Sequence, residues 1–222
     1  MKRRACEVID LGLCPYPTAY AIQKEIVRSK AEGSDTDTLI LVEHLPVVTL
    51  GRRGRHENIR VSTDYLKSLG IEVVSTDRGG DVTYHGPGQL VGYPIIDLKA
   101  YQQDVDWILR KLEGILIVSL KRIGIDAYCE RGMTGVWVGG AKIAAIGIGI
   151  SHWVTFHGFA LNVAPMMEHF SLIIPCGIKD KPVTSVRDVL AYSPDMEEVK
   201  QIVIESFCEG FGLERLRPEL AK

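Results

Sequence analysis

The sequence predicts an α/β (α+β) sandwich in which a mixed, largely antiparallel sheet is covered by helices. Three observations predict this fold class: helical patterns are dispersed along the chain, many short β-like runs lie between them, and strands and helices do not alternate regularly. Such a pattern is typical of helices packed on one sheet, whereas a doubly wound fold needs regular alternation. The 222 residues carry no linker rich in Pro, Gly or Ser, so we expect a single domain over residues 1–222.

The first half of the chain is predicted to hold one helix, several short strands and one exposed loop. Ala19, Ile22 and Ile26 share one face of a helix over residues 16–32. Residues 51–60 (GRRGRHENIR) are rich in arginine and indicate an exposed basic loop. The strands are predicted at residues 38–43 and 47–50 with a turn at Pro46, at 72–75 and 81–84 around a turn at Gly79-Gly80, and at 90–97.

The second half begins with the clearest helical pattern of the chain, over residues 104–123. Its apolar residues recur every three or four positions and therefore share one face. Another amphipathic helix is predicted over residues 194–210, and residues 166–172 are predicted to form a short helix after Pro165. Short strands are predicted at residues 126–129, 134–138, 142–150 and 153–163.

Composition excludes several classes of function. The net charge is −2, which gives no support for binding to nucleic acid or to a membrane surface. The basic N-terminus is not followed by a long apolar run, and no stretch of about 18 apolar residues occurs, so we expect neither a signal peptide nor a membrane span. Five widely spaced cysteines without a CxxC pair indicate reduced thiols, and we expect a cytoplasmic protein.

The segment Arg78–Pro94 (RGGDVTYHGPGQLVGYP) is the first of four segments that point to chemistry. Its five glycines allow the backbone to approach a ligand closely and to present N–H donors. It fits neither the P-loop pattern nor the dinucleotide-binding pattern. The structural alternative is a Gly-rich hairpin turn with one structural histidine.

Two further segments place polar side chains in apolar runs. Lys142 lies within GGAKIAAIG, where it is either a lysine on the solvent face of a strand or a partly desolvated amine that can act as a base. His157 lies within FHGFALNV, where a histidine is usually a core residue with its hydrogen bonds satisfied. Residue type alone leaves both alternatives open.

The fourth segment, IIPCGI, places Cys176 between a proline and a glycine. This sequence cannot continue a helix, so the thiol should lie at a tight bend. A thiol needs a base or a positive field to become a useful nucleophile at neutral pH. Taken alone, Cys176 is more often an inert residue than a catalytic one.

Together, in their order and spacing, the four segments resemble the motifs of the octanoyltransferases of lipoate biosynthesis. The resemblance implies an acyltransferase with a fold related to biotin and lipoate ligases. It implies that octanoyl-acyl carrier protein donates an octanoyl group to Cys176. The acceptors would be lysines of lipoyl domains, on the E2 subunits of 2-oxoacid dehydrogenases and on the glycine cleavage H protein. It implies no cofactor, no metal, and neither nucleic acid nor membrane as a partner.

The resemblance also assigns roles to residues. Cys176 corresponds to the nucleophile and Lys142 to the base that takes its proton, so we expect the two side chains within hydrogen-bond reach. Backbone N–H groups near Cys176 and in the Gly-rich segments are natural oxyanion donors. The positions that match the family's acyl-binding slot are Arg78, Gly79, Gly80, Asp81, Val82, Thr83, Tyr84, His85, Ala145, Ile146, Gly147, His157, Gly158, Phe159 and Ala160.

The basic loop suggests a separate hypothesis. Arg52, Arg53, Arg55 and Arg60 could steer acyl carrier proteins and lipoyl domains, which are typically acidic. The alternative is that the arginines are simply solvated. Charge alone does not choose between the two.

Three other functions compete with the acyltransferase. An ATP-dependent lipoate or biotin ligase on the same fold would need no nucleophilic cysteine. A hydrolase would pair Cys176 with His85 or His157 and would leave Lys142 without a task. A noncatalytic metal-binding module would use His44, His85 and His157, but no close ligand pair such as HxxxH occurs.

Overall fold

The large sheet of the protein has eight strands and runs through the middle of the molecule. The structure is a computed structural model and describes residues 4–178 and 181–216. The first three strands in the order below are parallel to one another, and every later pair of neighbours, from the third and fourth strands onward, is antiparallel. The predicted fold class is therefore confirmed. In spatial order, the strands are β11 (Glu214–Arg215), β1 (Ala5–Cys14), β2 (Asp37–His44), β6 (Gln89–Ile95), β10 (Val154–Asn162), β9 (Ala141–Ser151), β8 (Met133–Val138) and β7 (Tyr128–Glu130).

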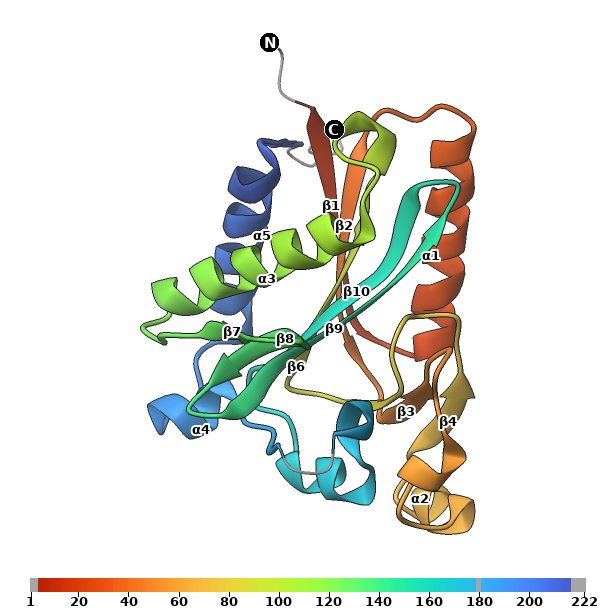
Figure 1. Ribbon diagram of the computed structural model, residues 1–222, viewed down its shortest axis with the longest axis vertical. Coiled ribbons are helices and arrows are strands. Elements are labelled where there is room, and N and C mark those ends of the chain that lie inside the picture. The colour runs from red at the N-terminus through yellow and green to blue at the C-terminus, as the bar shows by residue number, and fades with distance from the viewer. Residues whose placement is uncertain (1–3, 179–180, 217–222) are drawn as a thin grey trace, which may run out of the picture.

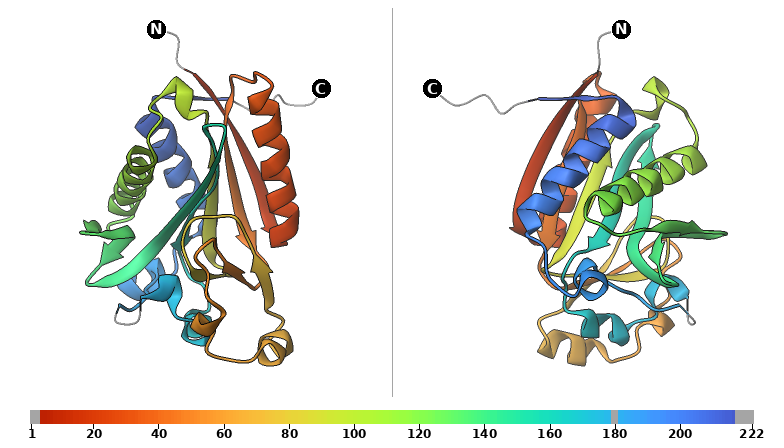
Figure 2. Two further views of the ribbon diagram at one scale, coloured as in Figure 1. Left: turned by 45° about the vertical axis from the view of Figure 1, so that its right-hand side comes forward. Right: turned by 90° about the vertical axis from the view of Figure 1, so that its left-hand side faces the viewer.

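Helices cover both faces of this sheet. Figure 2 shows α3 (Val105–Arg122) and α5 (Met196–Phe211) on one face and α1 (Tyr16–Ala31) on the other. The first face buries the apolar stripe of α3, including Leu112 and Leu116, and the second buries the stripe of α1, including Ala19. The two apolar layers make the sheet the rigid centre of the fold.

A second sheet lies at one end of the large sheet (Figure 1). It has three strands in the order β4 (Glu72–Ser75), β3 (Val47–Leu50) and β5 (Val82–His85). A third apolar cluster fills the space between it, the short helix α2 (Thr63–Ser68) and the 3₁₀ turn η3 (Met167–Leu172). This end of the molecule carries the basic loop, with its 3₁₀ turn η1 (His56–Asn58), and the turn η4 (Pro175–Gly177).

The predicted strands and helices are present, with residues 166–172 forming the 3₁₀ turn η3, and the structure corrects the pairing and adds elements. The strands predicted around Gly79-Gly80 both exist, but β3 lies between them, so they do not form a hairpin. The strands on either side of Pro46 belong to different sheets. Sequence patterns missed β1, whose register shifts between Asp10 and Leu13, because such an irregularity breaks period-two alternation. They also missed the short elements α2, β11, α4 (Val186–Leu190) and the 3₁₀ turn η2 (Leu98–Ala100).

Candidate active site

Cys176 lies at the centre of a tight turn, as its neighbours predict. Its backbone has φ of 57° and ψ of 15°, which is left-handed and uncommon for a residue with a side chain. The turn is held by hydrogen bonds: the amide of Ile174 donates to the Asn58 carbonyl at 2.7 Å and the amide of Gly177 donates to the Ile174 carbonyl at 3.0 Å. Such strain persists where the surrounding structure holds it, and it is common at functional sites.

Lys142 reaches this turn from the start of β9. Its Nζ lies 3.6 Å from the Sγ of Cys176. Only 7% of the residue is exposed, so it is not a lysine on a solvent face. The expected contact between amine and thiol is present.

Two residues that sequence patterns did not single out shape the path of the Lys142 side chain. Nζ lies 4.9 Å from the ring centroid of Trp137, an arrangement in which the ring face attracts a cation. A Cβ on Gly135 would lie 3.3 Å from Cε of Lys142 and 2.7 Å from the carbonyl oxygen of Ala144, so a glycine is needed there. Gly135 also has φ of 128°, which favours glycine.

Asp81 connects the basic loop to the cysteine turn. Its Oδ2 accepts from Nδ2 of Asn58 at 2.6 Å, and its Oδ1 accepts from the amide of Arg55 at 3.0 Å. Asn58 in turn accepts from the amide of Ile174, two residues before Cys176. The carboxylate predicted to bind substrate is thus committed to three protein donors, since Oδ1 also accepts from the amide of Val82.

Arg78 holds the Gly-rich loop against β3. Its guanidinium donates to the hydroxyl and the carbonyl of Thr49 and to the carbonyls of Gly79 and Asp81. No carboxylate is among these partners, and burial lowers the pKa of this guanidinium. Gly147 lets the loop cross β9, because a Cβ there would lie 2.7 Å from the carbonyl oxygen of Gly79.

A narrow cavity, here called the inner slot, begins at Cys176 and runs over the sheet. Its floor contains two cross-strand pairs of small residues on β9 and β10, Gly147 with Gly158 and Ala145 with Ala160. Small side chains leave room for a ligand where larger ones would fill the space. The inner slot brings together predicted residues with four that patterns did not single out for it: Arg78, Gly79, Gly80, Asp81, Thr83, His85, Ala145, Ile146, Gly147, His157, Gly158, Phe159 and Ala160, with Tyr16, Val91, Tyr93 and Cys176.

Two residues predicted for this slot lie elsewhere. Alternate side chains of β5 point to opposite faces, so Thr83 and His85 line the inner slot while Val82 and Tyr84 belong to the third apolar cluster. Tyr84 also hydrogen-bonds Nδ1 of His169 at 2.7 Å. Alternate residues of this strand therefore line the inner slot and pack in the third apolar cluster.

Aromatic and imidazole rings gather at the far end of the inner slot. Nε2 of His44 lies 2.6 Å from the hydroxyl oxygen of Tyr93, and Nδ1 of His85 lies 2.6 Å from Oε1 of Gln89. Burial lowers the pKa of His44 to about 4 and that of His85 to about 3. Both rings are neutral at neutral pH, so neither histidine brings charge to the slot.

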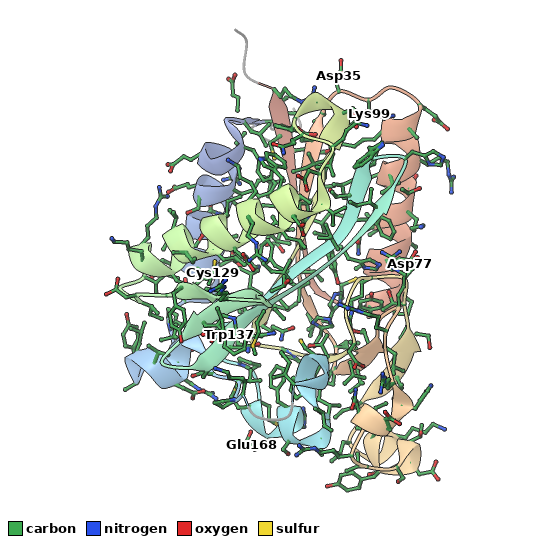
Figure 3. The ribbon with its side chains drawn as sticks, viewed as in Figure 1. Asp35, Asp77, Lys99, Cys129, Trp137 and Glu168 are labelled. Carbon is green, nitrogen blue, oxygen red and sulfur yellow. The ribbon has the colours of Figure 1, made fainter. Side chains whose placement is uncertain are left out.

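His157, which is buried, pairs with the partly exposed Asp77 on the α1 side of the slot. Its Nε2 lies 2.7 Å from Oδ1 of Asp77, and its backbone is left-handed with φ of 56°. Burial lowers the pKa of His157 to about 4, so the imidazole is neutral and the contact is a hydrogen bond. Figure 3 shows Asp77 on the α1 side and Trp137 on the β8 side of the strand pair β9 and β10.

The expected histidine partner of a cysteine hydrolase does not contact the thiol. His157 is engaged with Asp77 and His85 with Gln89, while the amine of Lys142 lies at Sγ. In the part of the chain that the structure describes, no three His, Cys, Asp or Glu side chains gather into a group that could hold a metal ion. The geometry favours a lysine–cysteine pair.

A larger cavity lies in front of Cys176 and is here called the entrance cavity. Its volume is about 1020 Å³, and it shares Cys176, Gly79 and Gly80 with the inner slot. Arg52, Arg53 and Arg55 line its rim, and Lys142 lines its interior. A ligand in this cavity would meet positive charge outside and the thiol inside.

Within the described ranges, no helix is both long and apolar enough to cross a membrane.

The chain is similar to known proteins over most of its length. Residues 15–208 match the lipoyl protein ligase A/B catalytic domain. The chain is 45% identical to an octanoyltransferase of Caldicellulosiruptor saccharolyticus, over 96% of this chain and 90% of the relative. It is 47% identical to an octanoyltransferase of Koribacter versatilis, over 90% of this chain and 82% of the relative.

Solved structures share the fold at low sequence identity. A lipoate-protein ligase A bound with ATP has a TM-score of 0.80 at 20% identity, over 98% of this chain and 90% of that one. A lipoate protein ligase from T. acidophilum with bound lipoic acid has a TM-score of 0.79 at 20% identity, over 97% and 88%. A biotin protein ligase from Aquifex aeolicus has a TM-score of 0.54 at 16% identity, over 93% and 70%.

Proposed function

This chain belongs to the lipoyl protein ligase A/B catalytic domain family and, within it, to the octanoyltransferases, and we propose that it transfers its octanoyl group through a thioester on Cys176. The observation that carries this proposal is the 3.6 Å separation between Nζ of Lys142 and Sγ of Cys176 at the mouth of the inner slot. The enzyme is an acyltransferase of lipoate biosynthesis. The cysteine supplies the nucleophile and the lysine the base.

In the first step, Lys142 takes the thiol proton and the Cys176 sulfur attacks the carbonyl carbon of the donor thioester. The tetrahedral intermediate collapses, the bond to the donor sulfur breaks, and the ammonium of Lys142 returns the proton to the leaving thiolate. One thioester replaces another, so the step is nearly balanced in energy and consumes no ATP. Close placement of base and thiol is what general-base activation requires.

In the second step, the amine of an acceptor lysine attacks the acyl-enzyme. The amine of Lys142 takes a proton from the attacking nitrogen, an amide bond forms, and the proton passes to the departing Cys176 thiolate. A thioester is converted to a more stable amide, so this step runs downhill. The covalent intermediate predicts ping-pong kinetics.

Backbone amides near the thiol are suited to hold the negative oxygen of both intermediates. Within residues 4–178 and 181–216, the amides of Gly80 and Cys176 have no protein acceptor, and both residues line the entrance cavity. An N–H group that is already oriented stabilises an oxyanion without further reorganisation. We assign the oxyanion site to these two groups.

The inner slot suits the octanoyl chain. Its floor contains two pairs of small residues, the histidines at its far end are neutral, and Cys176 lies at its entrance. Burial of each methylene contributes about 0.8 kcal/mol, so the tail supplies much of the binding energy. The predicted slot residues thus contact the acyl chain as the walls of the slot. They are Arg78 to His85 without Val82 and Tyr84, Ala145 to Gly147, and His157 to Ala160.

We propose for this chain the partners that its resemblance to the octanoyltransferases implies. The donor is octanoyl-acyl carrier protein, and the acceptors are lipoyl-domain lysines on E2 subunits of 2-oxoacid dehydrogenases and on the glycine cleavage H protein. The arginines at the rim of the entrance cavity support docking of acidic proteins, because opposite charge raises the association rate. This proposal concerns Arg52, Arg53 and Arg55, whereas Arg60 does not line the cavity.

Intact-mass spectrometry after incubation with octanoyl-acyl carrier protein tests the acyl-enzyme. The wild type should gain one octanoyl group, Cys176→Ala should gain none, and Cys129→Ala, which removes an exposed cysteine elsewhere, should still gain one. Adding a lipoyl domain without ATP should then move the group to that domain. No adduct on the wild type, under conditions that preserve thioesters, would exclude the mechanism. A requirement for ATP would instead favour the ligase.

A further inference from the structure

Tyr16 separates the inner slot from another cavity on the surface. The ring lines the inner slot, and it also lines a cavity of about 460 Å³, here called the side pocket. The side pocket lies beside the first turn of α1, between Tyr20, Thr76 and Asp77, and opens to solvent. Tyr16 itself is only 3% exposed. One side chain therefore stands between the inner slot and a pocket that is open to solvent.

The Tyr16 ring is held firmly in this position. It is the first residue of α1, directly after Pro15, which restricts the backbone there. Its ring stacks on His85 at 6.2 Å with planes 10° apart and lies 5.2 Å from the ring of His44. Its hydroxyl lies 3.0 Å from Oγ1 of Thr76. A ring held on its faces and at its hydroxyl forms a fixed wall.

The other rings at the far end have the protein core behind them. Behind the Tyr93 ring lies His44, to which the Tyr93 hydroxyl is hydrogen-bonded. Behind the His85 ring lies Gln89, which hydrogen-bonds both His85 and Asn162. Neither Tyr93 nor His85 lines the side pocket. Removing either ring would enlarge an enclosed void, whereas removing the Tyr16 ring would connect the slot to solvent.

We propose that the Tyr16 ring is the end wall that limits the length of the acyl chain, and that without it the slot continues into the side pocket. This inference rests on the proposed function of the slot. The floor pairs Gly147–Gly158 and Ala145–Ala160 present no obstacle along the sheet, so chain length is decided where the rings begin. A chain longer than octanoyl has to displace the Tyr16 ring from its stacking partner and its hydroxyl partner.

Competition between donors of different length tests the wall. The enzyme is given an equimolar mixture of octanoyl-, decanoyl-, dodecanoyl- and tetradecanoyl-acyl carrier protein, and intact mass gives the ratio of the adducts on Cys176. Each added methylene that finds an apolar surface contributes about fourfold in affinity. Tyr16→Ala should raise the ratio of dodecanoyl to octanoyl adduct by at least about tenfold. The ratio in Tyr16→Leu should lie between those of the wild type and Tyr16→Ala. Tyr16→Phe, which keeps the ring, should retain the wild-type ratio.

Tyr20→Ala is the matched control. It removes a neighbouring ring of the same kind that lines the side pocket but not the inner slot, so it should retain the wild-type ratio. Adduct ratios are read only from acylated protein, so an unfolded fraction does not affect them. Wild-type ratios in Tyr16→Ala and Tyr16→Leu would overturn the proposal, as would an equal change in Tyr20→Ala.

Calorimetry with free octanoate and dodecanoate measures binding to the same slot without acyl transfer. Dodecanoate should gain affinity relative to octanoate in Tyr16→Ala and not in the wild type. Failure of the wild type to form any adduct, with this binding difference intact, would overturn the acyl-enzyme and not the wall. Equal relative affinities in all variants would overturn the wall alone.

Discussion

Nζ of Lys142 lies 3.6 Å from Sγ of Cys176, although 34 residues separate them in the sequence. Lys142 is held on its backbone as well, because its amide donates to the Pro182 carbonyl and its carbonyl accepts from the amide of Thr184. The chain that follows the cysteine turn therefore returns to pair with the lysine itself. The amine and the thiol are held by one local arrangement.

Removing the amine of Lys142 should slow formation of the acyl-enzyme. We expect Lys142→Met to lower the acylation rate by about 10²- to 10⁴-fold, because general-base catalysis contributes on that scale. Lys142→Arg should also be slow, since arginine keeps the positive charge but does not lose its proton in proteins. Time-resolved intact mass measures the rate, and iodoacetamide alkylation of Cys176 reports the reactivity of the thiol.

Lys181→Met is the control for this pair. Lys181 lies 5.7 Å from the same Trp137 ring that Lys142 faces, and it pairs with Glu130 on the surface. Its removal should leave acylation near the wild-type rate. Equal losses in both variants would assign the effect to charge around Trp137, and a fast Lys142→Met enzyme would remove the base from the mechanism.

The bridge from Asp81 through Asn58 to the cysteine turn should matter for both order and rate. Asn58→Ala removes the donor to the Asp81 carboxylate, and a hydrogen bond to a charged group contributes about 1.5–3 kcal/mol. We expect faster hydrogen exchange at the amide of Ile174 and slower acylation. Glu25→Gln changes an exposed carboxylate of α1 that does not line the entrance cavity, and it should alter neither. Unchanged exchange at Ile174 in Asn58→Ala would contradict the bridge.

The rim arginines predict a salt-dependent rate. Arg52→Glu with Arg53→Glu should slow transfer from the carrier protein several-fold at low ionic strength, and the difference should shrink at high salt as screening increases. Lys99→Glu with Lys121→Glu makes the same change in net charge away from the entrance cavity and should have little effect. Initial rates over a salt series measure this. A rate equal to wild type at low salt would mean that these arginines are merely solvated.

The three buried histidines predict that stability falls in mild acid. Burial lowers the pKa of His44 and His157 to about 4 and of His85 to about 3, whereas an unfolded histidine titrates near 6.5. Below about pH 6.5 the unfolded chain therefore binds more protons, and the free energy of unfolding falls as pH falls. The contribution is complete above pH 6.5 and is lost toward pH 4, by about 1.4 kcal/mol per pH unit for each histidine.

Urea denaturation at about pH 7, 6 and 5 measures this slope. His44→Gln should reduce the slope by about one third, because one of the three buried imidazoles is gone. His56→Gln, which removes an exposed ring, is the control and should keep the wild-type slope. The same slope in His44→Gln and the wild type would show that this histidine is not the source.

Local patterns were sufficient for several elements and for the reactive turn. The spacing of Ile108, Leu112 and Leu116 predicts α3, whose buried face the structure confirms. Pro175 and Gly177 predict a bend at Cys176, and the backbone there is left-handed. These features depend on near neighbours in the chain, which is why residue type and spacing suffice.

Packing decided what local patterns could not. The pleat of β5 sends Thr83 and His85 into the slot and Tyr84 into an apolar cluster, although the motif is continuous in sequence. Tyr16 was assigned only to a helix, and its place as a wall depends on the meeting of α1 with rings from β2 and β5. Gly135 and Trp137 shape the path of Lys142 because β8 pairs with β9.

The sequence by itself predicted the fold class, the bend at Cys176 and the candidate pair of Cys176 and Lys142, because motif, periodicity and turn chemistry are carried by residues close along the chain. Only the tertiary structure decided that the amine reaches the thiol, that Asp81 ties the basic loop to the cysteine turn, and that Tyr16 closes the slot. Those contacts join residues far apart along the chain: Asp81 and Asn58 are 23 residues apart, and Lys142 and Cys176 are 34 residues apart. They exist because two sheets and a helix pack against one another, and spacing along the chain carries no record of that packing.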